Sequence, residues 1–284
     1  MNNLKSKRSA RLIDMTRYLM ENPHTLVPLT FFAERYSSAK SSISEDLTIV
    51  RQTFRDRGIG LLETIPGAAG GSKFIPYILK EEAEQFVNEI KQALNDQSRL
   101  LPGGYIYMAD LLSRPYILRQ IGRIIATQYL NHDIDAVMTV ATKGIPIAQS
   151  IANLLNVPFV IARHDSRITD GSTISVNYVS GSNRRIEKMV LSKRSLPEGS
   201  NVLIVDDFLR GGGSAAGLSD LVKEFNCNVV GISFFAEGVY NGERKISADQ
   251  YTSIFKINTE NDKISVSEGN YDNKVYGYLD NKEN

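Results

Sequence analysis

Apolar residues recur every three or four positions in three stretches near the N-terminus, a spacing typical of amphipathic helices. The pattern predicts a first helix that ends before Pro23, a short second helix with Thr30 as its N-cap, and a third helix over residues 40–54. The apolar positions of these helices are Leu12, Met15, Leu19 and Met20; Phe31, Phe32 and Tyr36; and Ile43, Leu47, Val50 and Phe54. A small polar turn precedes the third helix, so the second and third form a helix-turn-helix.

Two short strands follow the third helix. Residues 59–64 and 73–75 flank a glycine-rich segment, which predicts a hairpin with a flexible tip. Helix, helix-turn-helix and hairpin is the order of a winged helix-turn-helix, in which the third helix enters the major groove of DNA and the wing reaches a minor groove or the backbone. Many small helical bundles share the helical part of this pattern, so the prediction of DNA binding rests on the pattern together with the positive charge and the terminal position of this segment.

The polar face of the third helix consists of short hydroxyls and cations, which suit base edges and phosphate oxygens. Serines at the start of a helix are also ordinary caps, so Ser41 and Ser42 have a purely structural alternative. The candidate DNA-binding residues of the three helices and the wing are Lys40, Ser41, Ser42, Ser44, Arg51, Arg55, Gly71, Lys73, Arg8 and Arg11.

The balance of charged residues changes near residue 76, where the pattern of apolar residues also changes. Residues 1–76 hold eleven Lys and Arg against seven Asp and Glu, although all 284 residues together carry a net charge of only +1. A basic head on a mildly acidic body points to nucleic acid, and a solvated surface is the alternative. We therefore predict a winged-helix DNA-binding domain over residues 1–76 and a second domain over residues 77–284, which opens with a helix over residues 80–100.

Strands and helices alternate through the second domain. This order predicts an α/β fold with a mostly parallel sheet and helices on both faces, in which ligands bind beyond the carboxyl ends of the strands. The predicted strands are residues 136–140, 159–162, 202–205 and 229–235, and the predicted helices are residues 116–129, 146–155 and 214–225. The last ~25 residues are polar, and we expect them to fray.

The most informative stretch is VLIVDDFLRGGGSAAGL, residues 202–218. Glycines let backbone N–H groups crowd around a phosphate, and the helix that begins near Ser214 offers its positive end to the same anion. Asp206 and Asp207 suit sugar hydroxyls or a metal ion carried with the ligand, so the implied ligand is a sugar phosphate. A tight turn before a capped helix is the alternative, but it would not need three consecutive glycines.

The same stretch resembles the phosphoribosyl-pyrophosphate (PRPP) motif of type I phosphoribosyltransferases. Residues 139–146 resemble the pyrophosphate loop of that family, and residues 101–105 resemble the lead-in to its base-binding hood. With the head included, the whole chain is similar to the PurR-type purine-operon regulators of Gram-positive bacteria. The resemblance implies that Asp206 and Asp207 hold the ribose hydroxyls, that residues 210–214 hold the 5′-phosphate, and that residues 141–144 line the pyrophosphate.

The effector-binding candidates combine these motifs with nearby aromatic and basic residues. Phe208 and Tyr105 are candidates for stacking on a purine, with core packing as the alternative. Arg210 replaces the small residue usual in the transferases, and either contacts additional phosphates or is a plain surface cation. The cations of the basic segment 163–194 either contact the diphosphate and, in part, DNA, or form the solvated edge of a hairpin. The candidates are Asp206, Asp207, Phe208, Leu209, Arg210, Gly211, Gly212, Gly213, Ser214, Ala141, Thr142, Lys143, Gly144, Tyr105 and Arg163.

The resemblance implies a cytoplasmic, homodimeric repressor of purine biosynthesis genes that binds double-stranded operator DNA. In such a repressor we expect PRPP to relieve DNA binding, and a competing purine nucleotide such as guanosine tetraphosphate to favour it. A working purine phosphoribosyltransferase with an accessory head is the main alternative. A third is an RNA-binding regulator, which the winged head disfavours because a helix cannot read the deep, narrow major groove of A-form RNA.

No separate cofactor is expected beyond a magnesium ion that comes with PRPP, and no membrane segment is predicted. The three histidines lack metal-ligand spacing, and the lone Cys227 has no catalytic partner, so we assign all four structural roles and no catalytic residue.

Overall fold

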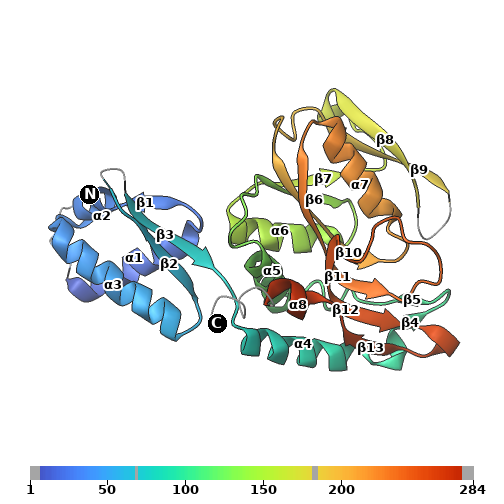
Figure 1. Ribbon diagram of the computed structural model, residues 1–284, viewed down its shortest axis with the longest axis horizontal. Coiled ribbons are helices and arrows are strands. Elements are labelled where there is room, and N and C mark those ends of the chain that lie inside the picture. The colour runs from blue at the N-terminus through green and yellow to red at the C-terminus, as the bar shows by residue number, and fades with distance from the viewer. Residues whose placement is uncertain (1–6, 68–69, 181–184, 277–284) are drawn as a thin grey trace. The chain divides into compact units, whose positions relative to one another are not determined.

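The chain forms two compact units, the first ending at Leu79 and the second beginning at Lys80. The computed structural model describes residues 7–67, 70–180 and 185–276 (Figure 1). Each unit has its own hydrophobic core, and the two are described separately below.

The first unit contains three helices and a three-stranded antiparallel sheet in the order β1-β3-β2. A third strand, β1, was not predicted. It is too short to show a pattern, yet it buries Val27 and pairs with the wing strand β3. The elements are α1 (Arg8–Glu21), β1 (Leu26–Pro28), α2 (Leu29–Tyr36), α3 (Lys40–Asp56), β2 (Gly60–Ile65) and β3 (Gly71–Pro76).

Apolar side chains from all three helices and the wing form the core of this unit. Met15, Leu19, Phe32, Ile43, Leu47, Val50, Phe54, Leu62 and Phe74 are almost fully buried. At the helix ends, the predicted N-cap Thr30 is wrong, and so is the alternative that Ser41 and Ser42 are caps. Thr30 lies inside α2, which starts at Leu29 after Pro28, and α3 begins after Ala39 with no side-chain cap, so Ser41 and Ser42 are not N-caps.

The second unit is built on a six-stranded sheet in the order β13-β12-β11-β10-β6-β7. Strands β6, β7, β10, β11 and β12 are parallel to one another, and the edge strand β13 is antiparallel to β12. This arrangement confirms the predicted fold class. The strands are β6 (Ala136–Val140), β7 (Phe159–Ala162), β10 (Asn201–Leu209), β11 (Asn228–Gly238), β12 (Tyr251–Asn258) and β13 (Ser265–Glu268). Two smaller antiparallel pairs join β4 (Leu100–Leu101) to β5 (Tyr105–Ile106) and β8 (Thr173–Val179) to β9 (Ile186–Ser192).

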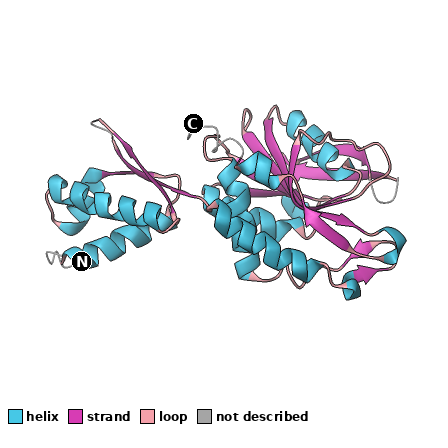
Figure 2. Cartoon of the chain, turned by 60° about the horizontal axis from the view of Figure 1, so that its bottom comes forward, coloured by secondary structure: helices cyan, strands magenta, loops and turns pink. Residues whose placement is uncertain are grey.

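Helices cover both faces of this sheet (Figure 2). Helix α7 (Gly213–Glu224) and the β8–β9 hairpin pack on one face, where they share a core with alternate residues of β10 such as Val202 and Ile204. On the other face the Tyr129 ring, just after α5, packs against Gly231 of β11. The helices other than α7 are α4 (Lys80–Leu94), α5 (Pro115–Gln128), α6 (Gly144–Leu155) and α8 (Tyr271–Val275).

Two predictions about the second unit are wrong. The helix expected over residues 80–100 ends at Leu94, because Asp96 accepts a hydrogen bond from the Ser98 N–H and starts a short 3₁₀ turn. Fraying is expected over the last ~25 residues, but α8 lies in that stretch with Tyr271 and Val275 buried; residues 277–284 lie outside the described residues. Among the described residues, no helix is both long enough and apolar enough to cross a membrane.

Candidate functional site

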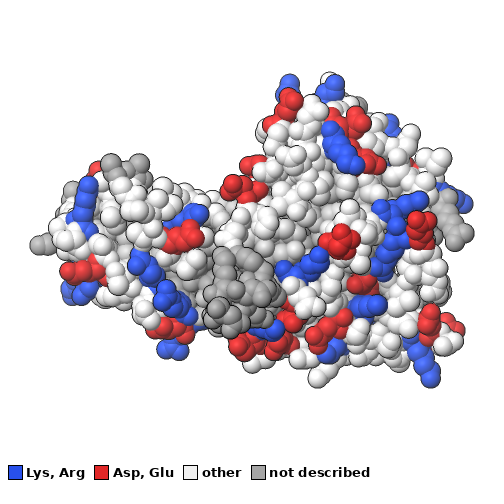
Figure 3. All heavy atoms as spheres, viewed as in Figure 1, with Lys and Arg blue, Asp and Glu red and all other residues white. Residues whose placement is uncertain are grey.

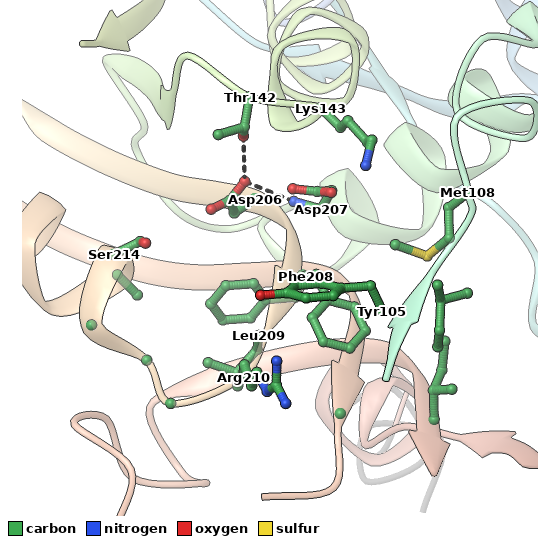
Figure 4. A pocket seen from close by; sticks show the side chains of 18 of the residues that line it. Tyr105, Met108, Thr142, Lys143, Asp206, Asp207, Phe208, Leu209, Arg210 and Ser214 are labelled. Atoms are coloured by element: carbon green, nitrogen blue, oxygen red, sulfur yellow. Dashed lines mark hydrogen bonds between the residues drawn. The ribbon is translucent and has the colours of Figure 1, made fainter. Parts of the chain in front are cut away.

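A cavity of about 640 Å³ opens at the carboxyl ends of the parallel strands β10, β11 and β12 (Figure 4). Strand β10 delivers Asp206 and Asp207 to it, and the loop between β10 and α7 forms one of its walls. The lining residues include Tyr105, Thr142, Lys143, Asp206, Asp207, Phe208, Leu209, Arg210, Gly211, Gly212, Gly213 and Ser214. Twelve of the fifteen effector-binding candidates therefore meet in one place.

The two adjacent carboxylates have different surroundings. Asp206 is only 7% exposed, and its Oδ1 accepts hydrogen bonds from Thr142 Oγ1 at 3.0 Å and from the Asp207 N–H at 2.9 Å. Burial, together with repulsion from Asp207, raises the pKa of Asp206 well above its ordinary value. Asp206 thus joins β10 to the 141–144 loop, while the half-buried Asp207 is the more accessible of the two.

The glycine loop leads directly into helix α7. Gly212 has a φ of +78° and precedes the first helical residue, Gly213, so the chain reverses in the left-handed region that glycine adopts at little cost. A side chain at Gly212 would also lie 3.0 Å from Ile246 Cγ1. Because the first N–H groups of a helix have no partner within it, this loop and the start of α7 form a suitable site for an anion.

Three candidates do not line the cavity. Gly144 packs so closely against β10 that a Cβ there would lie 2.7 Å from Asp206 Oδ1, and its N–H donates to Thr142 Oγ1 at 3.2 Å. Ala141 precedes Thr142 in the same loop. Arg163 forms a backbone bridge with Val190 of β9, outside the cavity. The binding role of these three residues remains a prediction.

Aromatic side chains bound the cavity near Arg210. The Arg210 guanidinium carbon lies 5.5 Å from the centre of the half-exposed Tyr105 ring, so this cation is not a plain surface charge. The Phe208 ring packs against the backbone of Gly238 on the neighbouring strand. Figure 4 shows Tyr105 and Phe208 on the same side of the cavity. The two rings offer flat, apolar faces, and the Arg210 guanidinium adds a positive charge beside the Tyr105 ring.

Several lining residues were not predicted. They come from the hood, from the β8–β9 hairpin, from the first turn of α7 and from β11 and β12, and include Gly104, Ile106, Met108, Ser180, Ala215, Phe234, Gly238, Val239, Ile257 and Thr259. The rule that ligands bind at the carboxyl ends of parallel strands could have identified Gly238 and Val239 at the end of β11, and also Ile257 and Thr259 if β12 had been predicted. Ile106, Met108 and Ser180 are brought to the cavity by contacts between distant segments, which leave no local signal.

One face of α3 in the first unit has the properties expected of a DNA-reading surface. Lys40, Ser44, Thr48, Arg51 and Arg55 follow one another at spacings of four, four, three and four residues, so they share one helix face, which lies beside the core-facing side of α3. Among the described residues, Lys40 and Arg55 are exposed and take part in no ion pair. Figure 3 shows Lys and Arg side chains over α3 with acidic groups among them. Thr48 was not predicted, and Ser42 lies off this face.

Arg51 and Lys73 connect the elements of the DNA-binding unit. Arg51 Nε donates to the Leu62 carbonyl at 3.1 Å, and the same guanidinium contacts Thr64 Oγ1, so α3 is tied to the wing strand β2. Lys73 Nζ lies 3.2 Å from Glu63 across the wing. The side chains of Arg51 and Lys73 are both partly exposed, and their contact with DNA stays a prediction.

Three further DNA-binding candidates, Arg8, Arg11 and Gly71, make contacts that stabilise the first unit. Asp46 of α3 is 1% exposed and accepts hydrogen bonds from Arg8 Nε at 2.8 Å and from Arg11 Nε and Nη2 at 3.0 and 2.8 Å. Arg11 itself is only 12% exposed, so it joins α1 to α3 more than it faces solvent. Gly71 is buried between β1 and β2, with its backbone close to Val27.

No group of three or more His, Cys, Asp and Glu side chains among the described residues is arranged to hold a metal ion. The three histidines and Cys227 lie outside the cavity lining, and Cys227 is a buried thiol whose Sγ contacts the Pro197 carbonyl.

Two family models match the two units. One, described as "Bacterial purine repressor, N-terminal", matches residues 7–76, and the other, described as "Phosphoribosyl transferase domain", matches residues 108–273. The chain is also 29% identical to the xanthine phosphoribosyltransferase of Alkaliphilus metalliredigens, a match that covers 56% of this chain and 82% of that protein.

Full-length relatives share both units. The purine biosynthesis transcriptional repressor PurR of Bacillus subtilis is 52% identical over 271 residues, which cover 94% of each chain. The purine biosynthesis transcriptional activator PurR of Lactococcus lactis subsp. lactis is 50% identical, over 93% of this chain and 98% of that one. The chain therefore belongs to the PurR family of bacterial DNA-binding regulators that control purine biosynthesis.

Proposed function

We propose that this protein represses purine biosynthesis genes by binding double-stranded operator DNA through α3 and the wing, and that PRPP in the cavity of the second unit lowers this DNA affinity. The observation that carries the proposal is the convergence of Asp207, Lys143 and the 210–214 loop on one cavity in a chain that also has a DNA-binding head. A ligand shifts such an equilibrium only if it binds one conformation better than the other.

The cavity offers a complementary group for each part of PRPP. The 211–214 backbone and the start of α7 suit the 5′-phosphate, Asp207 suits the ribose hydroxyls, and Thr142 and Lys143 suit the diphosphate. A magnesium ion that arrives with the diphosphate would neutralise part of its charge.

A guanine nucleotide such as guanosine tetraphosphate is the proposed competitor. Tyr105 and Phe208 provide flat surfaces for a purine, and Arg210 adds a planar cation that suits additional phosphates. Occupancy by this nucleotide excludes PRPP and so maintains DNA binding.

The protein is proposed to act as a homodimer in the cytoplasm on an operator with two half-sites. A single α3 face contacts few bases, and a two-fold dimer doubles the contacts and reads a matching repeat in the DNA. Relatives carry the names of both a repressor and an activator, so the sign of the output is part of the proposal.

The test compares operator affinity, at fixed salt, with and without PRPP in the native protein and in Asp207→Ala. Asp207 lines the cavity of the second unit, so we expect unchanged affinity without ligand and loss of the PRPP response. Affinity that PRPP does not alter in the native protein would refute the proposal. A reporter fused to the operator gives the sign: repression requires higher expression when the head is inactivated by Lys40→Ala and Arg55→Ala.

A purine phosphoribosyltransferase remains the second candidate, because the cavity retains the Asp-Asp pair and the glycine loop of that fold. Our proposal is that the site senses PRPP without turning it over. Steady-state assays with PRPP and adenine, guanine, hypoxanthine or xanthine decide the matter, since turnover near the typical enzyme rate of about 10 s⁻¹ would contradict sensing alone.

A further inference from the structure

The connection between β11 and β12, residues 239–250, packs against the glycine loop of the cavity. The Lys245 N–H donates a hydrogen bond to the Gly211 carbonyl at 2.9 Å. Ile246 is 6% exposed, and its side chain occupies the space in which a side chain at Gly212 would lie. The connection therefore supports the loop through two residues, Lys245 and Ile246, that do not line the cavity.

This contact determines which way one peptide group of the loop faces. In a trans peptide the carbonyl and the following N–H point in opposite directions, and the described residues contain no cis peptide bond. Since the Gly211 carbonyl points toward Lys245, the Gly212 N–H points away from the connection. Gly212 lines the cavity, so its N–H is directed to the side on which an anion would bind.

A buried carboxylate holds the connection in place. Glu237, near the end of β11, is 7% exposed and accepts hydrogen bonds from Arg244 Nη1 at 2.6 Å, Tyr251 Oη at 2.7 Å and Ser253 Oγ at 2.8 Å. Burial alone would raise the pKa of Glu237, but these donors outweigh it and leave the pKa below its ordinary value. The carboxylate is therefore charged and fully engaged.

Arg244 is the member of this group that belongs to the connection itself. Besides its ion pair with Glu237, its Nη2 donates to the Gly238 carbonyl at 2.6 Å, and its guanidinium carbon lies 5.7 Å from the centre of the Tyr251 ring. Arg244 is the residue immediately before Lys245. Its fixed position consequently restricts where the Lys245 N–H can lie.

We propose that Arg244 is a positioning residue for the anion site: through Glu237 it holds the 239–250 connection against the glycine loop and keeps the Gly212 N–H directed into the cavity. This inference rests on the proposed binding of PRPP by that loop. It adds that the binding of only one part of PRPP depends on Arg244. The 5′-phosphate is affected, whereas the diphosphate, held by Thr142 and Lys143, is not.

The experiment measures binding of PRPP and of pyrophosphate by calorimetry in the native full-length protein, in Arg244→Met and in Arg244→Lys. Outer groups that orient a binding group typically change affinity by 10–100-fold, so we expect Arg244→Met to weaken PRPP binding about tenfold. The affinity of Arg244→Met for pyrophosphate should stay within about twofold of the native value, a much smaller change than the one expected for PRPP. Arg244→Lys keeps the charge and should give an intermediate PRPP affinity.

The matched control is Arg123→Met. Arg123 is 17% exposed and pairs with Glu82 in the same unit, but neither residue lines the cavity. This variant should bind PRPP as the native protein does. Unchanged PRPP affinity in Arg244→Met, or an equal loss of PRPP and pyrophosphate binding, would overturn the inference, the second because it indicates general damage to the unit.

Amide hydrogen exchange without any ligand separates this inference from the proposed function. We expect Arg244→Met to exchange faster than the native protein in residues 211–214 and 239–250, and at the same rate in residues 141–144. Unchanged exchange in residues 211–214 refutes the positioning role. Failure of the native protein to bind PRPP, with the exchange pattern as expected, refutes only the proposed function.

Discussion

Asp14 illustrates how a single side chain can make the head sensitive to acid. Its carboxylate accepts hydrogen bonds from Arg35 Nε at 2.7 Å and from Tyr36 Oη at 2.9 Å. The bond from Arg35 is the main cause of a pKa of about 2 for Asp14, against an ordinary value of 3.8. Asp14 thus links α1 to α2 in its charged form only.

We expect Asp14→Asn to destabilise the first unit at pH 7. The difference between the two pKa values corresponds to roughly 2.4 kcal/mol, which solvent screening of this partly exposed group reduces to about 1 kcal/mol. Because the pKa is lower in the folded state, the stabilisation is present above pH 3.8 and declines as the pH falls toward 2. Urea unfolding of the full chain, followed through methyl NMR signals of the first unit, measures it.

The control for Asp14 is Glu21→Gln. Glu21 is exposed and pairs with Arg17 on the surface of α1, so its removal should change stability by less than about 0.5 kcal/mol. A constant difference between the native protein and Asp14→Asn from pH 7 to pH 3 would show that the charge of Asp14 is not what stabilises the unit.

Arg11 and Lys40 should respond oppositely to mutation, although both are basic residues of the head. Arg11→Met leaves the buried Asp46 with only the half-exposed Arg8, and we expect a loss of roughly 2–3 kcal/mol of stability. Lys40→Ala removes an exposed cation with no ion pair, so stability should stay within about 0.5 kcal/mol while operator affinity falls. If Arg11→Met weakened DNA binding without destabilising the unit, Arg11 would be a DNA contact after all.

At the scale of elements, the pairing of β1 with β3 depends on the absence of a side chain at residue 71. A Cβ at Gly71 would lie 2.2 Å from the Val27 carbonyl oxygen, too close for either strand to stay in register. We expect Gly71→Ala to cost roughly 1–3 kcal/mol, as overpacking in a core does, and to shift the backbone NMR signals of β1.

The wing itself provides a comparison for Gly71. Gly67 has a φ of +113°, but a Cβ there would meet no atom of the described residues within 4 Å. Gly67→Ala should therefore carry only the local backbone strain and leave the β1 signals in place. Displacement of β1 by both variants would mean that strain in the wing, and not the contact at Gly71, controls this strand.

The elements predicted from the sequence are those with a strong local pattern. Strand β10, the glycine loop and α7 lie within 24 consecutive residues, so apolar run, carboxylates, glycines and helix start are all visible together. Strands β1 and β13 have only three and four residues, too few for a clear pattern, and β1 is held by pairing with the distant strand β3. Thr30 looked like an N-cap because its hydroxyl suits that position, but the chain after Pro28 is already helical one residue earlier.

In the candidate site, too, the residues that could be predicted are those with a local sequence pattern. Residues 206–214 could be predicted because one motif contains them all, whereas the support from Arg244 and Glu237 could not. Arg244 lies 30 residues beyond Ser214, the last residue of that motif, in a connection with no pattern of its own. Its role depends on parallel strands that place the ends of β10 and β11 side by side, so that Leu209 lies opposite Glu237.

For the whole molecule, the small net charge of +1 conceals a division of labour. Many cations of the head are neutralised locally, as in the pairs of Arg8 and Arg11 with Asp46 and of Lys73 with Glu63. Lys40 and Arg55 remain unpaired on one face of α3, so the part of the charge available to phosphates is smaller and more localised than the composition suggests.

The salt dependence of DNA binding should reveal this localisation. Each phosphate contact releases condensed counterions and contributes about 0.9 to the slope of log affinity against log salt. We expect Lys40→Ala and Arg55→Ala each to lower the slope by about 0.9 per bound head, with the PRPP response retained. Asp207→Ala should keep the native slope and lose the response, because its carboxylate lines the cavity. Filter binding between 50 and 200 mM salt, the range over which such contacts change affinity by about 10³–10⁵, measures both quantities. A lowered slope in Asp207→Ala, or a lost PRPP response in Lys40→Ala, would show that reading DNA and sensing the metabolite are not separable in this chain.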